Sequence, residues 1–185
     1  EAAIASTISA GDPVLCIANG LYGDGFADFV SDYGGGPTVV SAPYDEPLDV
    51  KAVKSVLGDK EFAAATMVHC ETPTGVLNDL EPILKLLADH DVLTIVDAVS
   101  SLGGTPVPTD TIDLCLGASQ KAFSAPPGLT TVSISDAAWD AIEARESESL
   151  YTNLLPWRNV SEQFPYTHLA ANVTALDEAL AILLE

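Results

Sequence analysis

One lysine and one aspartate are the residues of this chain best placed for chemistry, because each follows a run of small and apolar residues. Lys121 lies in Gly-Ala-Ser-Gln-Lys-Ala-Phe (117–123), and Asp97 ends a separate apolar run. The 185-residue chain has only seven lysines and arginines against 27 acidic residues, so a lysine among apolar neighbours is conspicuous. A lysine amine can form an imine with a carbonyl, and a carboxylate can hold a pyridinium nitrogen. The pair therefore predicts a site for pyridoxal phosphate between two strand ends.

The charge composition narrows the partners that the chain can have. A formal net charge of −20 repels phosphate backbones and anionic lipid, so we expect neither a nucleic-acid nor a membrane partner. The acidic residues are spread along the chain, which argues against a disordered acidic tail. Scarce lysine with abundant aspartate is typical of extreme halophiles and predicts a haloarchaeal origin, with an acidic mesophilic enzyme as the alternative.

The three cysteines, Cys16, Cys70 and Cys115, lie far apart, each in or beside an apolar run. Such residues are usually buried reduced thiols, which suits a cytoplasmic protein. No spacing of cysteine and histidine suggests a metal site. We find no apolar stretch long enough to span a bilayer and no basic leader, so we expect a soluble cytoplasmic protein.

Apolar runs that alternate with helical patterns predict the secondary structure. The runs are apolar throughout, which is typical of parallel strands covered on both faces. We expect strands over 14–18, 38–41, 63–68, 92–96, 112–116 and 130–134. We expect helices over 1–10, around Phe26 and Val30, over 49–57 with Gly58 as a stop, after Asp79, and over 136–146. The remainder is an irregular, aromatic segment over 147–166 and an amphipathic C-terminal helix over 167–185.

This order of elements predicts an α/β fold with a mostly parallel central sheet and helices on both faces. The last two strands are joined without a helix, so one of them should be antiparallel. In such a sheet, ligands bind beyond the carboxyl ends of the strands. Polar or aromatic residues follow four predicted strands, in the segments 19–23, 71–75, 97–99 and 119–121. We therefore expect these segments to meet at one edge.

Four runs carry a resemblance to a known family. They are Ala-Asn-Gly-Leu-Tyr-Gly (18–23), Glu-Thr-Pro-Thr-Gly-Val-Leu (71–77), Val-Asp-Ala-Val-Ser-Ser-Leu-Gly-Gly-Thr-Pro (96–106) and Gly-Ala-Ser-Gln-Lys-Ala-Phe-Ser-Ala-Pro-Pro-Gly (117–128). The chain resembles the large domain of class V, fold-type I pyridoxal-phosphate aminotransferases, nearest to the alanine–glyoxylate and serine–glyoxylate group. The resemblance covers nearly the whole chain, and it implies transamination between alanine or serine and a 2-oxo acid such as glyoxylate or pyruvate.

The resemblance also implies roles at the cofactor ring. Lys121 would form the Schiff base and carry the proton between the substrate and the cofactor, while Asp97 would keep the pyridine nitrogen protonated. Tyr22 would stack on the ring, where several relatives have Trp, and Val99 would contact the opposite face. Thr72 would donate a hydrogen bond to the phenolic oxygen of the cofactor. Each residue also has a structural alternative. Lys121 could be a surface lysine, Asp97 a capping or turn carboxylate and Tyr22 a loop tyrosine. Val99 could be a core residue and Thr72 a turn residue.

Two further residues match phosphate contacts of the family. Gln120 would reach the phosphate in its own subunit, and Thr167 matches a threonine that contacts the phosphate of the neighbouring subunit, which implies a homodimer. Phe164 stands where relatives often have Tyr, so it cannot donate that hydrogen bond. Histidine stacks on the cofactor in some relatives, but Tyr22 fills that place here, and we interpret His69 as a structural strand-end residue.

Two parts that the family has are not expected within this chain. The glycine-rich phosphate turn would precede residue 1, and the small domain with the arginine for the substrate carboxylate would follow residue 185. Arg145 and Arg158 are the only arginines, and neither matches that position. We therefore expect a truncated large domain whose transaminase activity alone is weak or absent.

Other functions stay open from the sequence. A cysteine desulfurase-like lyase usually has His before the lysine, where this chain has Gln120, and needs a mobile nucleophilic cysteine. A 2-aminoethylphosphonate transaminase is a close alternative, slightly disfavoured by the Ala-Pro-Pro-Gly run. A non-catalytic or split fragment that serves dimer assembly is a further alternative from another class. A dinucleotide-binding domain lacks its glycine fingerprint here.

Overall fold

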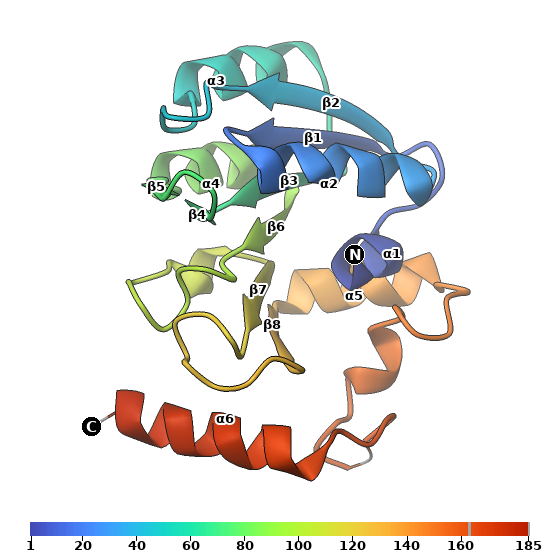
Figure 1. Cartoon of the computed structure of the whole chain (residues 1–185). Coiled ribbons are helices and arrows are strands. Elements are labelled where there is room, and N and C mark those ends of the chain that lie inside the picture. The colour runs from blue at the N-terminus through green and yellow to red at the C-terminus, as the bar shows by residue number, and fades with distance from the viewer. Residues whose placement is uncertain (163, 185) are drawn as a thin grey trace.

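Six strands form the central sheet of the protein, in the order β2-β1-β3-β6-β7-β8 (Figure 1). The computed structural model describes residues 1–162 and 164–184; residues 163 and 185, which fall in the expected irregular segment and C-terminal helix, lie outside it. Every neighbouring pair is parallel except β7 and β8. The expected mostly parallel sheet with one antiparallel strand is therefore confirmed. The strands are β1 (Pro13–Ala18), β2 (Gly36–Ser41), β3 (Ala64–Val68), β6 (Leu93–Asp97), β7 (Leu114–Ala118) and β8 (Thr130–Ile134).

A second, two-stranded antiparallel sheet follows β3 directly. It pairs β4 (Cys70–Glu71) with β5 (Val76–Leu77), where the sequence indicated only a loop. The hairpin turn between them ends at Gly75, whose φ of 74° lies in the left-handed region that glycine tolerates. Two-residue strands leave no periodic pattern, which is why the sequence did not reveal them.

Helices cover both faces of the large sheet. One face carries α1 (Ala2–Thr7), α2 (Leu21–Asp32) and α5 (Asp136–Arg145), and the other carries α3 (Val50–Asp59) and α4 (Glu81–Ala88). Gly58 lies inside α3, so the expected stop there is wrong; Lys60, in an extended conformation, follows the helix instead. Helix α6 (Ala170–Leu183) lies apart from the sheet and contributes no buried residue (Figure 1). Two short 3-10 turns, η1 (Thr109–Thr111) and η2 (Leu155–Trp157), complete the elements.

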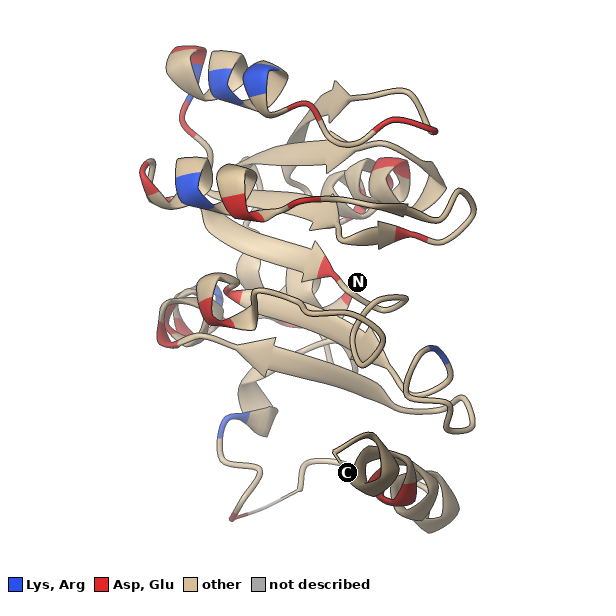
Figure 2. Cartoon of the chain, turned by 90° about the vertical axis from the view of Figure 1, so that its left-hand side faces the viewer, with Lys and Arg blue, Asp and Glu red and all other residues tan. Residues whose placement is uncertain are grey.

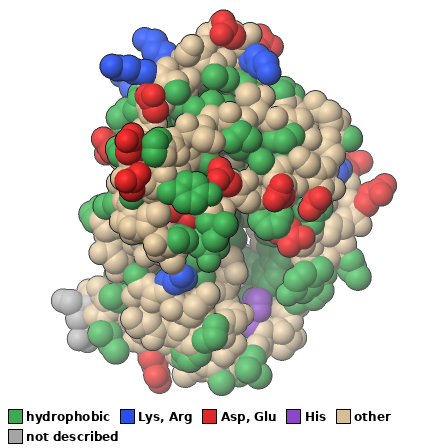
Figure 3. All heavy atoms as spheres, turned by 45° about the horizontal axis from the view of Figure 1, so that its top comes forward, with side chains coloured by type: hydrophobic (Ala, Val, Ile, Leu, Met, Phe, Trp, Pro, Cys, Tyr) green, Lys and Arg blue, Asp and Glu red, His purple; other side chains and the backbone are tan. Residues whose placement is uncertain are grey.

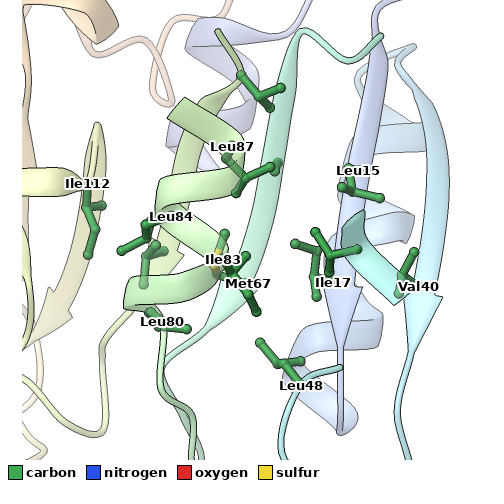
Figure 4. Close-up of a cluster of buried hydrophobic side chains, with 14 of the residues drawn as sticks. Leu15, Ile17, Val40, Leu48, Met67, Leu80, Ile83, Leu84, Leu87 and Ile112 are labelled. Carbon is green, nitrogen blue, oxygen red and sulfur yellow. The ribbon is translucent and has the colours of Figure 1, made fainter. Parts of the chain in front are cut away.

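The sheet is buried on both faces, as the apolar runs predicted. Strand β3 has no exposed residue, and α4 packs Ile83 and Leu87 in the same buried cluster as Met67 of β3 (Figure 4). Figure 2 shows the charged residues on helices and loops, with the strands almost free of them. Among the described residues, no helix is both long and apolar enough to cross a membrane.

A buried pair of amides joins the segments that leave the carboxyl ends of the strands. Asn19, after β1, donates to Asn78 at 2.9 Å, and Asn78 donates back at 3.2 Å and to the Val68 carbonyl at 2.9 Å. Asn19 also donates to the Glu46 carbonyl, and Asn78 accepts the Leu48 N–H. The two amides are buried themselves, and together they tie four segments at one edge.

We predict that Asn78→Ala lowers the free energy of unfolding by about 2–4 kcal/mol, because the buried groups that bond Asn78 lose their partner. Urea unfolding followed by circular dichroism measures this. The matched control is Asn159→Ala on the exposed surface, which should change stability by less than about 0.5 kcal/mol. A similar small loss for both variants would contradict this role for the amide pair.

Candidate active site

The four segments that we expected to meet do follow neighbouring parallel strands. Strand β6 pairs with β3 and β7, so that Asp97 lies opposite Val68 on one side and Leu116 on the other. The chain leaves β1 toward α2 and leaves β3 by way of the β4–β5 hairpin toward α4, and these helices cover opposite faces. The gap between β1 and β3 is therefore a topological switch point, the usual place for a ligand in such a sheet.

Asp97 is a largely buried carboxylate at the end of β6. Its Oδ1 accepts the backbone N–H of Val99 at 2.8 Å, and its other oxygen has no hydrogen bond with any described residue. Burial raises the pKa of Asp97; the Val99 N–H opposes this, the negative charge of Glu71 adds to it, and the Lys121 ammonium lowers it. A carboxylate with a raised pKa and one free oxygen is suited to share a proton with a ring nitrogen.

Lys121 is half-buried in the loop after β7. Ser119, fully buried, ties this loop together by donating to the Pro126 carbonyl at 2.7 Å and accepting the Leu129 N–H at 3.4 Å. Among the described residues the one ion pair joins Arg158 and Glu143, so the Lys121 ammonium is not within ion-pair distance of Asp97. The Lys121 charge therefore acts on Asp97, whose pKa it lowers, without an ion pair between them.

Glu71 is a site residue that the sequence did not single out. Its side chain is fully buried, and its two carboxylate oxygens accept the backbone N–H groups of Tyr22 and Gly23, each at 3.1 Å. These N–H groups belong to the first turn of α2, so Glu71 caps that helix from 49 residues away. Only the clustering of Glu with Thr and Gly after a strand hinted at it. Tyr22 itself is 49% exposed, with its ring free for a planar ligand.

The remaining predicted residues differ in how they are placed. Thr72 and Ser100 share a hydrogen bond between their hydroxyls, which links the hairpin turn to the segment after Asp97. Val99 is partly buried beside that segment, and Gln120 is exposed next to Lys121. Thr167 is exposed before α6 and shares no hydrogen bond with the other predicted residues. The structure thus brings six of the seven to the segments at the carboxyl ends of four neighbouring strands, with Gln120 exposed there, and leaves Thr167 apart.

His69 has a place in the hydrogen bonds behind the site. Its Nδ1 lies 2.9 Å from the Ser101 hydroxyl, which donates to the Ala98 carbonyl at 3.2 Å. Since the serine proton goes to that carbonyl, the ring donates from Nδ1. Burial lowers the pKa of His69, so the ring is neutral at pH 7. These bonds support the structural interpretation of this histidine.

Two of the three cysteines and both arginines are engaged by the fold, whereas Cys70 is only partly buried, unlike the expected buried thiol. Burial, reinforced by the charge of Asp97, raises the pKa of Cys115 to about 11, and burial also raises the pKa of Cys16. Such thiols are poor nucleophiles, which argues against a desulfurase-like role for them. Arg145 donates to the Ile8 carbonyl at 2.6 Å, and Arg158 pairs with Glu143 and lies over the Trp139 ring. In the described part of the chain, no group of three or more potential ligands is arranged to hold a metal ion.

Comparison with known proteins identifies the family. The model of the aminotransferase class-V family matches residues 32–183. This chain belongs to the class V aminotransferases. An uncharacterized aminotransferase of Methanocaldococcus jannaschii is 38% identical over 193 residues, which cover 100% of this chain and 50% of that protein. The alanine–glyoxylate aminotransferase of Oryctolagus cuniculus is 30% identical over 195 residues, with 100% and 50% covered.

A solved structure agrees with this assignment. The crystal structure of pyridoxamine–pyruvate aminotransferase from Mesorhizobium loti superposes with a TM-score of 0.94 at 33% identity, and the match covers 99% of this chain and 49% of that one. The class V aminotransferase resemblance seen in the sequence is therefore confirmed, and with it the pyridoxal-phosphate-dependent fold. The chain spans about half the length of the curated relatives it matches.

We predict that Asp97→Asn stabilises the cofactor-free chain at pH 7, because it removes a buried charge that lacks a full set of partners. The folded chain holds the Asp97 proton more tightly than the unfolded chain, whose carboxyl has the ordinary pKa of 3.8. Its contribution to stability therefore falls as the pH rises from below 3.8 through the raised pKa. A gain of about 1 kcal/mol would raise Tm by roughly 2–4 °C.

Thermal unfolding of both proteins between pH 3 and pH 8 measures the difference, and it should grow with pH. Asp28→Asn, on the exposed surface of α2, is the matched control and should follow the wild type at every pH. A variant of Asp97 that is less stable than the wild type at pH 7 would refute the expectation.

Proposed function

We propose that this chain supplies the cofactor-binding part of a pyridoxal-phosphate-dependent transamination between alanine or serine and a 2-oxo acid such as glyoxylate or pyruvate. The observation that carries the proposal is the placement of Asp97 and Lys121. Asp97 ends β6 and Lys121 follows the neighbouring strand β7 at the same edge, and the Lys121 charge lowers the pKa of Asp97 without an ion pair between them. The membership of the chain in the class V family supports the same activity.

The residues present fit the cofactor. Asp97 has a carboxylate oxygen without a hydrogen bond to any described residue, which is the acceptor that the N–H of a protonated ring nitrogen requires. Tyr22 offers an exposed aromatic face, and stacking on a cationic ring contributes roughly 1 kcal/mol. Bound pyridoxal phosphate would supply an electron-accepting ring that stabilises negative charge on the substrate carbon.

The other residues of this chain would then bind, orient and move protons. The Lys121 amine would hold the cofactor covalently and, once displaced, take the proton from the substrate carbon and return it to its new position. Val99 would contact the ring face opposite Tyr22, and Thr72 would bond the phenolic oxygen while Ser100 fixes its hydroxyl. Gln120 would reach the phosphate.

In this chain, which spans about half the length of its relatives, neither arginine is free to orient the substrate carboxylate. A bidentate arginine is the usual group for a substrate carboxylate, and both arginines here are engaged by the fold. We therefore propose that the chain alone turns over glyoxylate slowly or not at all, although it keeps the residues for the cofactor.

We predict that pyridoxal phosphate labels Lys121. After incubation and borohydride reduction, peptide mapping by mass spectrometry should find the added mass on this residue. Lys121→Ala should abolish the label, whereas Lys85→Ala on α4 should leave it unchanged. Absence of label anywhere would favour the non-catalytic fragment, and robust turnover of glyoxylate by the isolated chain would overturn the part of the proposal that concerns the arginine.

We also propose that the chain forms a homodimer through its C-terminal third. Large apolar side chains are exposed there, including Leu150 at 85%, Phe164 at 67% and Ile182 at 74%. Figure 3 shows hydrophobic side chains bordering a hollow in one face of the molecule. Such a concentration of apolar surface is typical of an interface, and Thr167 in the same region would reach the phosphate of the second copy.

We predict that sedimentation finds a dimer whose dissociation constant falls in molar KCl, because salt screens the repulsion between two chains of net charge −20. Ile182→Asp should weaken the dimer by about tenfold or more. Leu77→Asp, an equally drastic change at an exposed position of β5, is the control. A monomer at all salt concentrations would rule the interface out.

A further inference from the structure

We propose that Glu71 is a positioning residue for the cofactor ring, which acts by holding the backbone that carries Tyr22. This inference rests on the proposed function, because it assigns Glu71 to the same site.

Glu71 is an unusual residue for its location. In the eight described strands, Glu71 and Asp97 are the only charged residues, and both lie at the carboxyl edge. The Glu71 side chain is fully buried, and among the described residues no cation pairs with it. A buried carboxylate without a cation costs several kcal/mol unless other donors compensate it. A residue that serves only to fill space would not carry this charge.

The donors that compensate Glu71 are the backbone N–H groups of Tyr22 and Gly23. Both distances are 3.1 Å, and each carboxylate oxygen takes one N–H, so the carboxylate spans the first turn of α2. The positive end of the helix dipole adds to this attraction. The side chain thus fixes the orientation of the turn, and the Tyr22 side chain leaves the chain from that turn.

Gly20 shows how closely the carboxylate approaches. A Cβ built on Gly20 would lie 2.2 Å from Glu71 Cγ, which is far closer than two carbons can come. The Glu71 side chain therefore occupies the space beside Gly20, and only glycine allows that contact. The arrangement couples the loop after β1 to strand β4.

Glu71 is also linked to two other proposed site residues, Thr72 and Asp97. Thr72 follows it directly in the hairpin, and the Glu71 carbonyl accepts the Gly75 N–H at 2.8 Å. The negative charge of Glu71 also acts on Asp97, whose pKa it raises. Glu71 thereby bears on Tyr22, Thr72 and Asp97, three of the residues proposed for the cofactor.

A double-mutant cycle on cofactor affinity tests the inference. The dissociation constant of pyridoxal phosphate is measured by absorbance titration for the wild type, Glu71→Gln, Tyr22→Ala and the double variant. Glutamine keeps the size of the side chain, but its NH2 group cannot accept an N–H, so we expect about tenfold weaker binding. In the Tyr22→Ala background, where no ring remains to be positioned, the same change should weaken binding by less than about twofold.

Glu61→Gln, an exposed change of the same chemistry, should leave the affinity unaltered. If Glu71→Gln does not fold, Gly20→Ala replaces it in the cycle, because a Cβ there displaces the carboxylate and retains its charge. Losses that multiply in the double variant would mean that Glu71 merely stabilises the fold, and the inference would fail. A wild-type chain that binds no pyridoxal phosphate would instead overturn the proposed function together with the inference.

Discussion

Two buried carboxylates at the carboxyl ends of otherwise uncharged strands set the main physical constraint on this protein. Glu71 in the β4–β5 hairpin is fully buried and Asp97 at the end of β6 is mostly buried, and an uncompensated charge in such a place is costly. Glu71 is compensated by two backbone N–H groups at the start of α2. Asp97 has one such partner and the distant charge of Lys121, so its compensation is incomplete. A protonated ring nitrogen would complete it, and the cofactor and the fold would therefore stabilise each other.

Parallel strand order explains why these groups meet. Because β1, β3, β6 and β7 run in the same direction, the segments that follow them emerge at one edge. The antiparallel return of β8 joins β7 by a loop over 119–129, and Ser119 ties the start of this loop to its end. Lys121 is thus held at the same edge as Asp97 by a loop that needs no crossover helix, and Tyr22 lies beside the switch between β1 and β3.

The apolar strands and the positions of Asp97 and Lys121 at strand ends could be predicted from sequence, because each depends on a local run of residues. The mostly parallel sheet followed from the alternation of strands and helices, but the order of the strands was not predicted. The role of Glu71 could not be predicted, since its contacts with Tyr22 and Gly23 join residues 49 and 48 positions apart. The prediction that α3 ends at Gly58 was wrong because tertiary packing outweighed the local preference of glycine. Glycine often ends helices, but α3 continues through Gly58 because it costs only about 1 kcal/mol inside a helix whose apolar face, with Val53 and Leu57, is buried.

Cofactor binding and substrate recognition separate in this chain. The residues proposed for the ring lie on strand ends and loops fixed by buried bonds, such as the Asn19–Asn78 pair. The two arginines serve instead to cap α1 and to anchor α5. Lysine is no substitute, because its ammonium is a point charge and lacks the planar fork that fixes a carboxylate in one orientation. Under the proposed function, the chain would hold the electron-accepting ring although neither arginine is free to align a substrate with Lys121, so that affinity for the cofactor and turnover would be independent properties.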